Sequence, residues 1–227
     1  MTDNSNVDEK IYCFWTDDNP ITPNRLIGLE TMRNNLKVPI EFLDWREISK
    51  RILPDVPLHP GYKYLSAVHK SDYLRCYFMH HFGGGYADLK FYTEDNNWKE
   101  SFRLINNNRE IDSVGVQESI TGGRRPIYNT PDGSARLIAT CYFICRKHSK
   151  FTTEWYARMM AKMDEKYEAL KSHPAEDPFD RSDKYPMKWC ELLGLIFHDV
   201  VFEMSFTDPY AIRHSLKSGR DNTKAYR

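Results

Sequence analysis

The sequence predicts a single α/β domain in which a mixed, mostly parallel central sheet is flanked by helices. The chain has 227 residues, enough for one domain of about 200 residues with a substantial core. Residues 10–43 read as a strand, a helix and a second strand, an order whose default is a right-handed crossover between parallel strands. Residues 69–92 then read as a helix, a glycine corner and another strand. Strands that alternate with helices are typical of an α/β sheet.

The first strand and helix leave a polar segment between them. The strand Lys10–Trp15 (KIYCFW) is apolar and is followed by four polar residues, from Thr16 to Asn19. The helix is expected to start at Thr22, because the proline after it suits the first helical position. A strand that runs into a polar loop is typical of the edge where α/β sheets bind ligands.

The helix and strand of residues 69–92 are expected to organise the functional site. The helix carries one apolar stripe, and Asp72 and Arg75 lie together on a neighbouring face because they are three residues apart. Three glycines then permit backbone angles that a side chain would block, which ends the helix and starts the strand Tyr86–Tyr92. This strand delivers Asp88 near its end, again at a ligand-binding edge.

The other elements follow from apolar periodicity and from proline starts. Further strands are expected at Val38–Leu43, Ser113–Gln117 and Leu137–Arg146, and further helices at Trp45–Leu53, Trp98–Ile105, Phe151–Leu170 and Pro186–Glu203. Residues 118–136 lack periodicity, and a loop of this length in a compact domain is usually functional or mobile. The expected organisation is a flexible leader at residues 1–9, the domain at residues 10–210, and a charged tail at residues 211–227.

Composition excludes several classes of partner. Lysine and arginine together number 32, as do aspartate and glutamate, and this balance argues against nucleic acid or an anionic membrane as partner. No stretch approaches the ~20 apolar residues of a membrane span, and the polar N-terminus does not resemble a signal peptide. The five cysteines show no paired ligand spacing. They are therefore expected to be reduced thiols in a cytoplasmic protein, with a metal or disulfide role as the alternative.

Two motifs resemble those of a known enzyme group. Residues 71–75 read S-D-Y-L-R and residues 83–90 read G-G-G-Y-A-D-L-K, which is similar to the S-D-x-x-R and G-G-x-Y-x-D-x-D motifs of DXD-type glycosyltransferases of the GT-A fold. That group includes capsular-polysaccharide and mannosyltransferase-like sugar transferases, clostridial glucosylating toxins and short viral glycosyltransferases. The strand at residues 11–16 is a third matching piece, so order and spacing agree over residues 10–92.

The resemblance implies a fold, a reaction and partners. The fold would be one Rossmann-like GT-A domain. The reaction would move a hexose or deoxyhexose from a UDP- or GDP-sugar to a hydroxyl of a glycan or glycoprotein, with retention of anomeric configuration. The group usually holds the donor diphosphate through Mn²⁺ or Mg²⁺, which stabilises the charge that develops as the sugar leaves.

The resemblance also implies roles for single residues. Asp72 would accept hydrogen bonds from hydroxyls of the donor sugar, and Arg75 would contact the sugar or its phosphate; the alternative is an ordinary ion pair on a solvated helix face. Asp88 would hold the metal. The remaining donor contacts would come from Phe14, Trp15, Thr16, Ser71, Lys90 and Arg124.

Two of these contacts have packing alternatives. Trp15 would stack on the nucleobase, because an aromatic face binds a base without a fixed hydrogen-bond pattern; core packing is the competing interpretation. Ser71 would contact the ribose or simply pack within its helix. Arg124 belongs to a glycine- and arginine-rich segment that would form a basic flap over the diphosphate or an acceptor-binding lip, or a plain surface loop.

Lys90 departs from the group's pattern, because it stands where the second aspartate of the D-x-D motif is expected. An ammonium group cannot ligate Mg²⁺ or Mn²⁺. Three interpretations stay open. Lys90 replaces part of the cation's charge at the diphosphate; Asp88 holds a metal with another ligand; or the protein is a catalytically inactive nucleotide-sugar-binding module. The candidates for the other ligand are Glu94, Asp95 and His198.

Other reaction classes find less support in the sequence. It contains no phosphate-binding P-loop and no G-x-S-x-G nucleophile elbow. The glycines at residues 83–85 follow a helix instead of opening one, so a dinucleotide-binding turn is not supported either. A nucleotidyltransferase remains a more distant possibility.

Overall fold

The computed structural model describes residues 5–16, 20–179 and 182–221. Within these residues, six strands form the main sheet in the order β2-β1-β3-β6-β5-β7. The strands are β1 (Ile11–Trp15), β2 (Ile40–Asp44), β3 (Gly84–Ala87), β5 (Ser113–Gln117), β6 (Ile138–Cys145) and β7 (Ile212–His214). β6 runs antiparallel to both of its neighbours, and the other neighbouring pairs are parallel. The predicted mixed, mostly parallel sheet is therefore confirmed.

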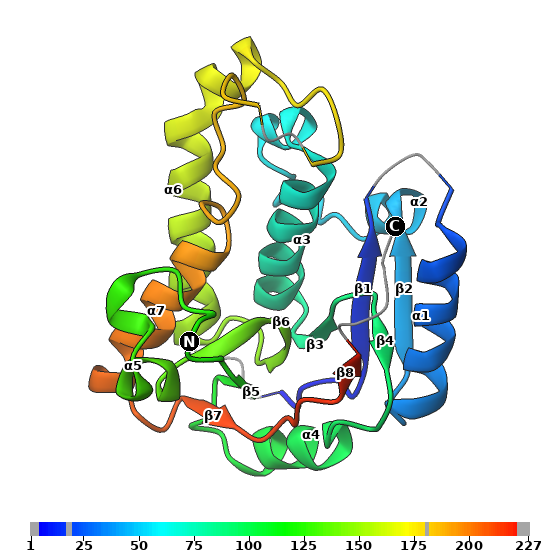
Figure 1. The fold of residues 1–227 in the computed structure, drawn as a ribbon, viewed down its shortest axis with the longest axis vertical. Coiled ribbons are helices and arrows are strands. Elements are labelled where there is room, and N and C mark those ends of the chain that lie inside the picture. The colour runs from blue at the N-terminus through cyan, green and yellow to red at the C-terminus, as the bar shows by residue number, and fades with distance from the viewer. Residues whose placement is uncertain (1–4, 17–19, 180–181, 222–227) are drawn as a thin grey trace.

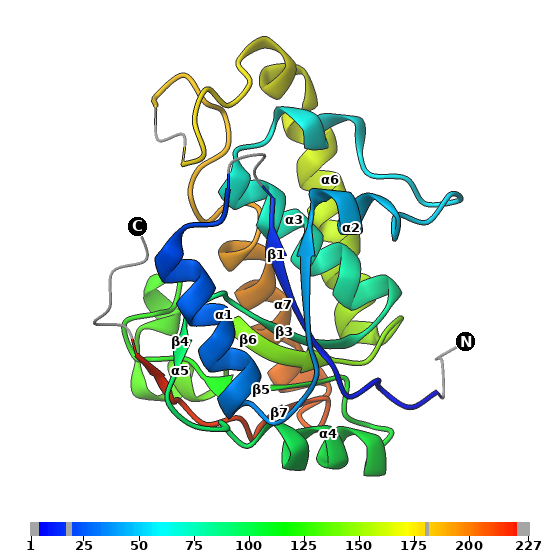
Figure 2. The ribbon, with the colours of Figure 1, turned by 90° about the vertical axis from the view of Figure 1, so that its right-hand side faces the viewer.

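Helices cover both faces of this sheet (Figures 1 and 2). They are α1 (Pro23–Asn35), α2 (Trp45–Ser49), α3 (Ala67–His81), α4 (Trp98–Asn107), α5 (Pro131–Ala135), α6 (Lys150–Ser172) and α7 (Gly194–Thr207), with short 3-10 turns at η1 (Pro60–Tyr64) and η2 (Pro126–Tyr128). α3, α6 and α7 contribute to one buried hydrophobic cluster, and α1 and α4 contribute to the other. Alternate residues of β1 face the two clusters, as a strand between two helical layers requires.

The ends of the early helices follow from single residues. The Thr22 side chain accepts a hydrogen bond from the backbone of Arg25 and caps α1, while Ser66 caps α3 in the same way. α3 ends at His81, and Gly83 then has a φ of 68°, a left-handed value that favours glycine. A Cβ atom at Gly85 would lie 2.8 Å from the Trp98 ring, so β3 can approach α4 only with glycine there.

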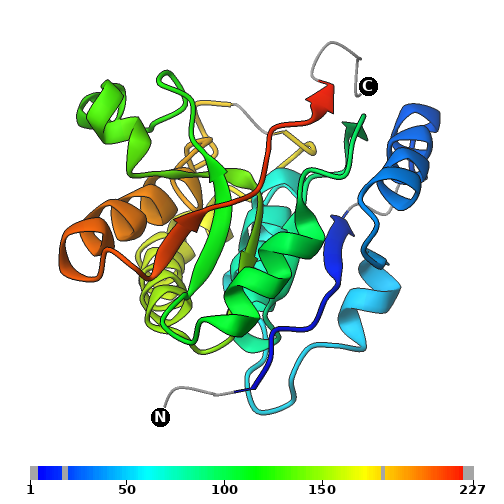
Figure 3. The ribbon, with the colours of Figure 1, turned by 90° about the horizontal axis from the view of Figure 1, so that it is seen from below.

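The segment predicted as one strand, Tyr86–Tyr92, contains the end of one strand and the whole of another. β3 ends at Ala87, and β4 (Phe91–Tyr92) pairs with β8 (Arg220–Asp221) in a separate two-stranded sheet (Figure 3). The intervening backbone lies against α1, because a Cβ at Gly28 would be 3.2 Å from the carbonyl of Lys90. Asp88 thus occupies a loop directly beyond β3.

The helix predicted at Pro186–Glu203 begins later, at Gly194. The residues before it form turns. The Glu191 carboxylate accepts a hydrogen bond from the Lys188 backbone and pairs with Lys166 of α6 at 3.0 Å. The segment is thus connected to α6, and its residues Leu192 and Leu193 are buried as the periodicity predicts, whereas Trp189 is exposed.

The predicted domain limits are too narrow. Val7, within the expected flexible leader, is buried, and its backbone exchanges two hydrogen bonds with the Asn106 side chain. The expected tail contributes β7 to the edge of the main sheet and β8 to the small sheet. The other parts of these segments, residues 1–4 and 222–227, lie outside the described residues.

Candidate functional site

A cavity of about 880 Å³ opens where β1 and β3 end. The first half of α3 forms one wall, and the segments around residues 117–124 and 189–194 form others. All the side chains expected to contact a donor line this cavity: Phe14, Trp15, Thr16, Ser71, Asp72, Arg75, Asp88, Lys90 and Arg124. The predicted polar cluster after β1 continues through residues 17–19, which lie outside the described residues. The sheet edge thus gathers most of the charged groups that the sequence singled out.

Arg75 is the centre of the polar network. One of its terminal nitrogens, Nη2, lies 2.7 Å from the Tyr86 hydroxyl and 3.2 Å from Oδ1 of Asp88. The other, Nη1, donates to the backbone carbonyl of Thr140 on β6. Its guanidinium carbon also lies 4.1 Å from the centroid of the Tyr86 ring, within the range of a cation–π contact. Arg75 therefore fixes Asp88 relative to the sheet.

Asp72 lies one helical turn before Arg75 and is equally buried, with 8% of its surface exposed against 7% for Arg75. Its Oδ1 atom is 3.7 Å from Nη2 of Arg75, so the expected ion pair forms, but inside the cavity instead of on a solvated face. Burial raises the pKa of Asp72, Arg75 and Arg124 lower it and Asp88 raises it, with a net value of about 7. The Asp72 carboxyl thus changes its protonation near neutral pH.

Lys90 binds Asp88 from the other side. The Nζ atom of Lys90 lies 3.2 Å from Oδ2 of Asp88, and both side chains are about one-fifth exposed. The Oδ1 atom of the same carboxylate accepts from the Tyr86 hydroxyl at 2.9 Å and from Arg75. Both oxygens of Asp88 are therefore already engaged by cationic or hydroxyl donors.

Among the described residues, the groups in contact with Asp88 are two cations and a hydroxyl, which do not fit Mn²⁺ or Mg²⁺ and their need for several oxygen ligands. The candidate second ligands are elsewhere: Asp95 pairs with Lys37 at 3.4 Å, and neither Glu94 nor Asp95 lines the cavity. His198 is completely buried and lies 3.5 Å from Oε2 of Glu118. Among the described residues, no group of three metal-ligating side chains lies at this cavity. Two positive charges beside Asp88 would also repel a divalent cation.

The aromatic and hydroxyl residues at the end of β1 differ in their surroundings. Phe14 is a core residue whose ring lies 5.0 Å from that of Phe78 and 5.6 Å from that of Tyr86. Trp15 is half-buried at the cavity wall. Thr16 donates a hydrogen bond of 2.8 Å to the carbonyl of Ala67, at the first turn of α3. Trp15 therefore offers the aromatic surface, and its neighbours position it.

The glycine- and arginine-rich segment divides into two parts. Arg124 is exposed and lies across Gly194, where a Cβ would be 3.1 Å from its side chain. Arg125 instead forms a two-pronged ion pair with Asp199 of α7. Tyr128 adds a 2.6 Å hydrogen bond to the same carboxylate. Arg125 thus attaches the segment to α7, and Arg124 faces the cavity.

Several lining residues were not identified from the sequence. Arg25, on the first turn of α1, donates to the backbone carbonyl of Leu89 and so supports the loop that carries Lys90. Glu118 lines the wall beneath Arg124. Trp189 is 46% exposed at the cavity, whereas the sequence predicted it on an apolar helix. Because Trp189 was assigned to that helix, its position at the cavity was not predicted.

Comparisons with known proteins give a distant likeness to solved structures. No protein-family model matches the chain, and no curated protein matches it. The apo crystal structure of mouse xyloside xylosyltransferase 1 matches with 14% identity over 92% of this chain and 85% of the other, at a TM-score of 0.48. Unrelated functions recur on similar α/β sheets at such similarity. In the described part of the chain, no helix has the length and apolarity needed to cross a membrane.

Proposed function

We propose that the chain is a nucleotide-sugar-dependent glycosyltransferase, which moves a hexose or deoxyhexose from a UDP- or GDP-sugar to a hydroxyl of a glycan or glycoprotein. The observation that carries this proposal is the meeting of Asp72, Arg75 and Asp88 with Lys90 and Trp15 in one cavity at the sheet edge. A nucleotide sugar presents a base, a diphosphate and a polyhydroxyl ring, and this cavity offers a complementary group for each.

The charge of the cavity suits a diphosphate. Its lining includes four cationic side chains, from Arg25, Arg75, Lys90 and Arg124, and three acidic ones, from Asp72, Asp88 and Glu118. Since the raised pKa of Asp72 leaves that carboxyl partly protonated at neutral pH, positive charge is in excess. Fixed cations that face developing negative charge stabilise the transition state without reorganisation.

Lys90 and Arg124 would neutralise the diphosphate in place of a divalent cation. A lysine ammonium is a compact point charge suited to phosphate oxygens. Lys90 is held at the mouth of β3 by Asp88, and Arg124 comes from the opposite wall. The site would therefore work without Mn²⁺ or Mg²⁺, the first of the three interpretations of Lys90.

The remaining side chains would orient the donor. The Asp72 carboxyl would bind two sugar hydroxyls, and Trp15 would stack on the base. The acceptor oxygen would form a bond to the anomeric carbon while the bond from that carbon to the diphosphate oxygen breaks. The acceptor proton would pass to the departing diphosphate, so that retention requires no separate side-chain base.

A second candidate is a nucleotide-sugar-binding module of the same fold that has no turnover. The ion pair between Lys90 and Asp88 favours it, because that carboxylate is occupied where the resembling enzymes hold their metal. Such a protein would still bind the donor through the same cavity.

Binding and turnover distinguish these proposals. UDP-glucose, UDP-galactose, GDP-mannose and GDP-fucose are titrated into the purified chain by calorimetry, and release of UDP or GDP is measured with a panel of glycan acceptors. Release supports the transferase. Binding without release supports the module, and failure to bind any nucleotide sugar contradicts both. Release of pyrophosphate from a nucleoside triphosphate would indicate a nucleotidyltransferase instead.

A further inference from the structure

Three histidines gather at the end of α3 that is remote from the donor cavity. His80 and His81 are the last residues of α3, and His148 lies in the turn before α6. Each can offer one ring nitrogen such that the three atoms lie within 4.8 Å of one another. Asp72 lies eight residues earlier on α3, about 12 Å along the helix axis. The cluster is thus separate from the proposed catalytic site.

We propose that His80, His81 and His148 bind a transition-metal cation of the Zn²⁺ class, which ties the end of α3 to the start of α6. Imidazole nitrogen is a preferred ligand of Zn²⁺, at about 2.0–2.1 Å. Tetrahedral coordination at that distance places ligand atoms roughly 3.4 Å apart. The three nitrogens already lie within 4.8 Å of one another, so binding would draw them closer together by rotation of their side chains.

Two ring nitrogens in the cluster are buried and lack a hydrogen-bond partner among the described residues. Nδ1 of His80 and Nε2 of His81 are inaccessible to solvent and form no hydrogen bond with any described residue. An unsatisfied buried polar atom lowers stability. Packing of the rings leaves these atoms unpaired, and a metal ion held by the cluster could supply a partner for ring nitrogens of both residues.

The rings are already held in position by tyrosines. Tyr156 of α6 stacks on His80, with centroids 4.7 Å apart and an angle of 9° between the planes. Tyr77 lies 4.5 Å from His81. The two contacts fix the planes of both imidazole rings at the end of α3.

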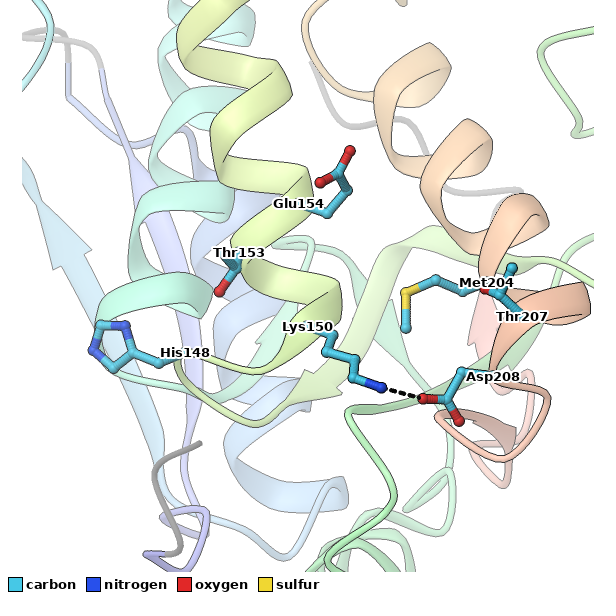
Figure 4. Close-up of a pocket in the computed structure, with 7 residues that line it drawn as sticks. All are labelled: His148, Lys150, Thr153, Glu154, Met204, Thr207 and Asp208. Carbon is cyan, nitrogen blue, oxygen red and sulfur yellow. Dashed lines mark hydrogen bonds and ion pairs between the residues drawn. The ribbon is translucent and has the colours of Figure 1, made fainter. Parts of the chain in front are cut away.

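The backbone of His148 has an uncommon conformation and is hydrogen-bonded to His80. Its φ is 51°, a left-handed value that is uncommon outside glycine. Its backbone amide donates to the carbonyl of His80 at 3.0 Å, which keeps the two residues adjacent. Figure 4 shows the His148 ring directed away from the ion pair of Lys150 and Asp208. The His148 ring lies beside the rings of His80 and His81, with centroids 4.8 Å and 5.9 Å away. Because His148 is exposed, a water molecule could bind the metal as a fourth ligand.

The test uses the purified full chain, stripped with a chelator and then dialysed. Co²⁺ is titrated while its visible ligand-field absorption is recorded, and Zn²⁺ is titrated by calorimetry. We expect one equivalent of each to bind. His148→Ala should weaken binding at least 10- to 100-fold, as loss of metal-site interactions does. His173→Ala, which removes an exposed histidine outside the cluster, should bind like the wild type.

A stability readout accompanies these titrations. Zn²⁺ should raise the melting temperature of the wild type and of His173→Ala but not that of His148→Ala, because only a ligand selective for the folded state stabilises it. Either of two results would overturn the proposal: Co²⁺ gives no ligand-field band with the wild type, or His148→Ala binds Zn²⁺ as tightly as the wild type. Donor binding does not enter these measurements, so they are independent of the proposed glycosyltransferase activity.

Discussion

The ammonium group of Lys90 lies 3.2 Å from Oδ2 of Asp88 and is directed into the carboxylate that the resembling enzymes use for a metal. Arg75 occupies the other oxygen of that carboxylate. Asp88 therefore acts as the anchor of two cations. In the proposed function, these fixed positive charges perform the electrostatic task of a divalent ion at the donor diphosphate.

Removal of the Arg75 side chain should destabilise the fold. Arg75→Ala removes the partner of the Thr140 carbonyl, the ion pair of the buried Asp72 carboxylate and one of the contacts of Asp88. Breaking such a network typically lowers the free energy of unfolding by about 3–5 kcal/mol. Arg75→Lys should be intermediate, because one ammonium cannot reproduce the two-pronged geometry. Urea unfolding measures both variants.

Arg51→Ala is the matched control for Arg75. Arg51 pairs with Glu41 and Glu47 at the surface, where such pairs contribute roughly 0–1 kcal/mol. An equal loss of stability in Arg51→Ala and Arg75→Ala would show that the buried network around Arg75 stabilises the fold no more than a surface ion pair does.

Asp72 should make stability depend on pH. Its pKa is about 7 in the folded chain against an ordinary value of 3.8, so the folded state binds more protons than the unfolded state between these values. This contribution is fully present below pH 3.8 and is lost as the pH rises to 7. Between pH 5 and pH 8, the free energy of unfolding of Asp72→Asn should rise by about 2–3 kcal/mol relative to the wild type.

Urea unfolding at several pH values tests this dependence on Asp72. A difference between variant and wild type that is constant over the pH range would mean that the Asp72 carboxyl titrates normally. Asp55→Asn serves as a control, because Asp55 is an exposed carboxylate outside the cavity.

Trp15 should contribute most of the affinity for the nucleobase. Stacking of a base on an aromatic side chain is worth about 1–3 kcal/mol, so Trp15→Ala should weaken donor binding about 5- to 150-fold. Trp15→Phe should retain most of the affinity. Trp45→Ala, in which an exposed tryptophan that stacks on Tyr62 outside the cavity is lost, should bind the donor normally in the same calorimetric titration. If Trp15→Ala also binds the donor with normal affinity, Trp15 does not stack on the base and serves only in packing.

Local features of the sequence predicted much of the fold. The cap at Thr22 and the glycines that end α3 depend on neighbouring residues alone, and they lie where expected. The strands Ser113–Gln117 and Ile138–Cys145 were likewise evident from apolar runs. β7 was missed because it is defined by pairing with a strand about one hundred residues earlier, and nothing local in residues 212–214 signals that pairing.

The candidate site was predictable only in its motif-bearing half. Asp72, Arg75 and Asp88 belong to short motifs, so their proximity followed from a helix, a corner and a strand. Glu118 and Trp189 enter the cavity from loops whose positions depend on distant contacts, such as that between Glu191 and α6. A single sequence carries no local signal for such contacts.

The metal dependence of donor binding shows whether Lys90 or a divalent cation neutralises the donor diphosphate. All proteins in this experiment carry His148→Ala, so that the histidine cluster does not respond to metal. Donor binding and release of the nucleotide are measured in EDTA and in Mn²⁺ for the protein that keeps Lys90 and for its variants Lys90→Ala and Lys90→Asp. With Lys90 present, we expect equal donor affinity and turnover in EDTA and in Mn²⁺. Lys90→Ala should bind the donor weakly in both, and Lys90→Asp should bind it only with Mn²⁺. Loss of donor binding in EDTA by the protein that keeps Lys90 would contradict the account.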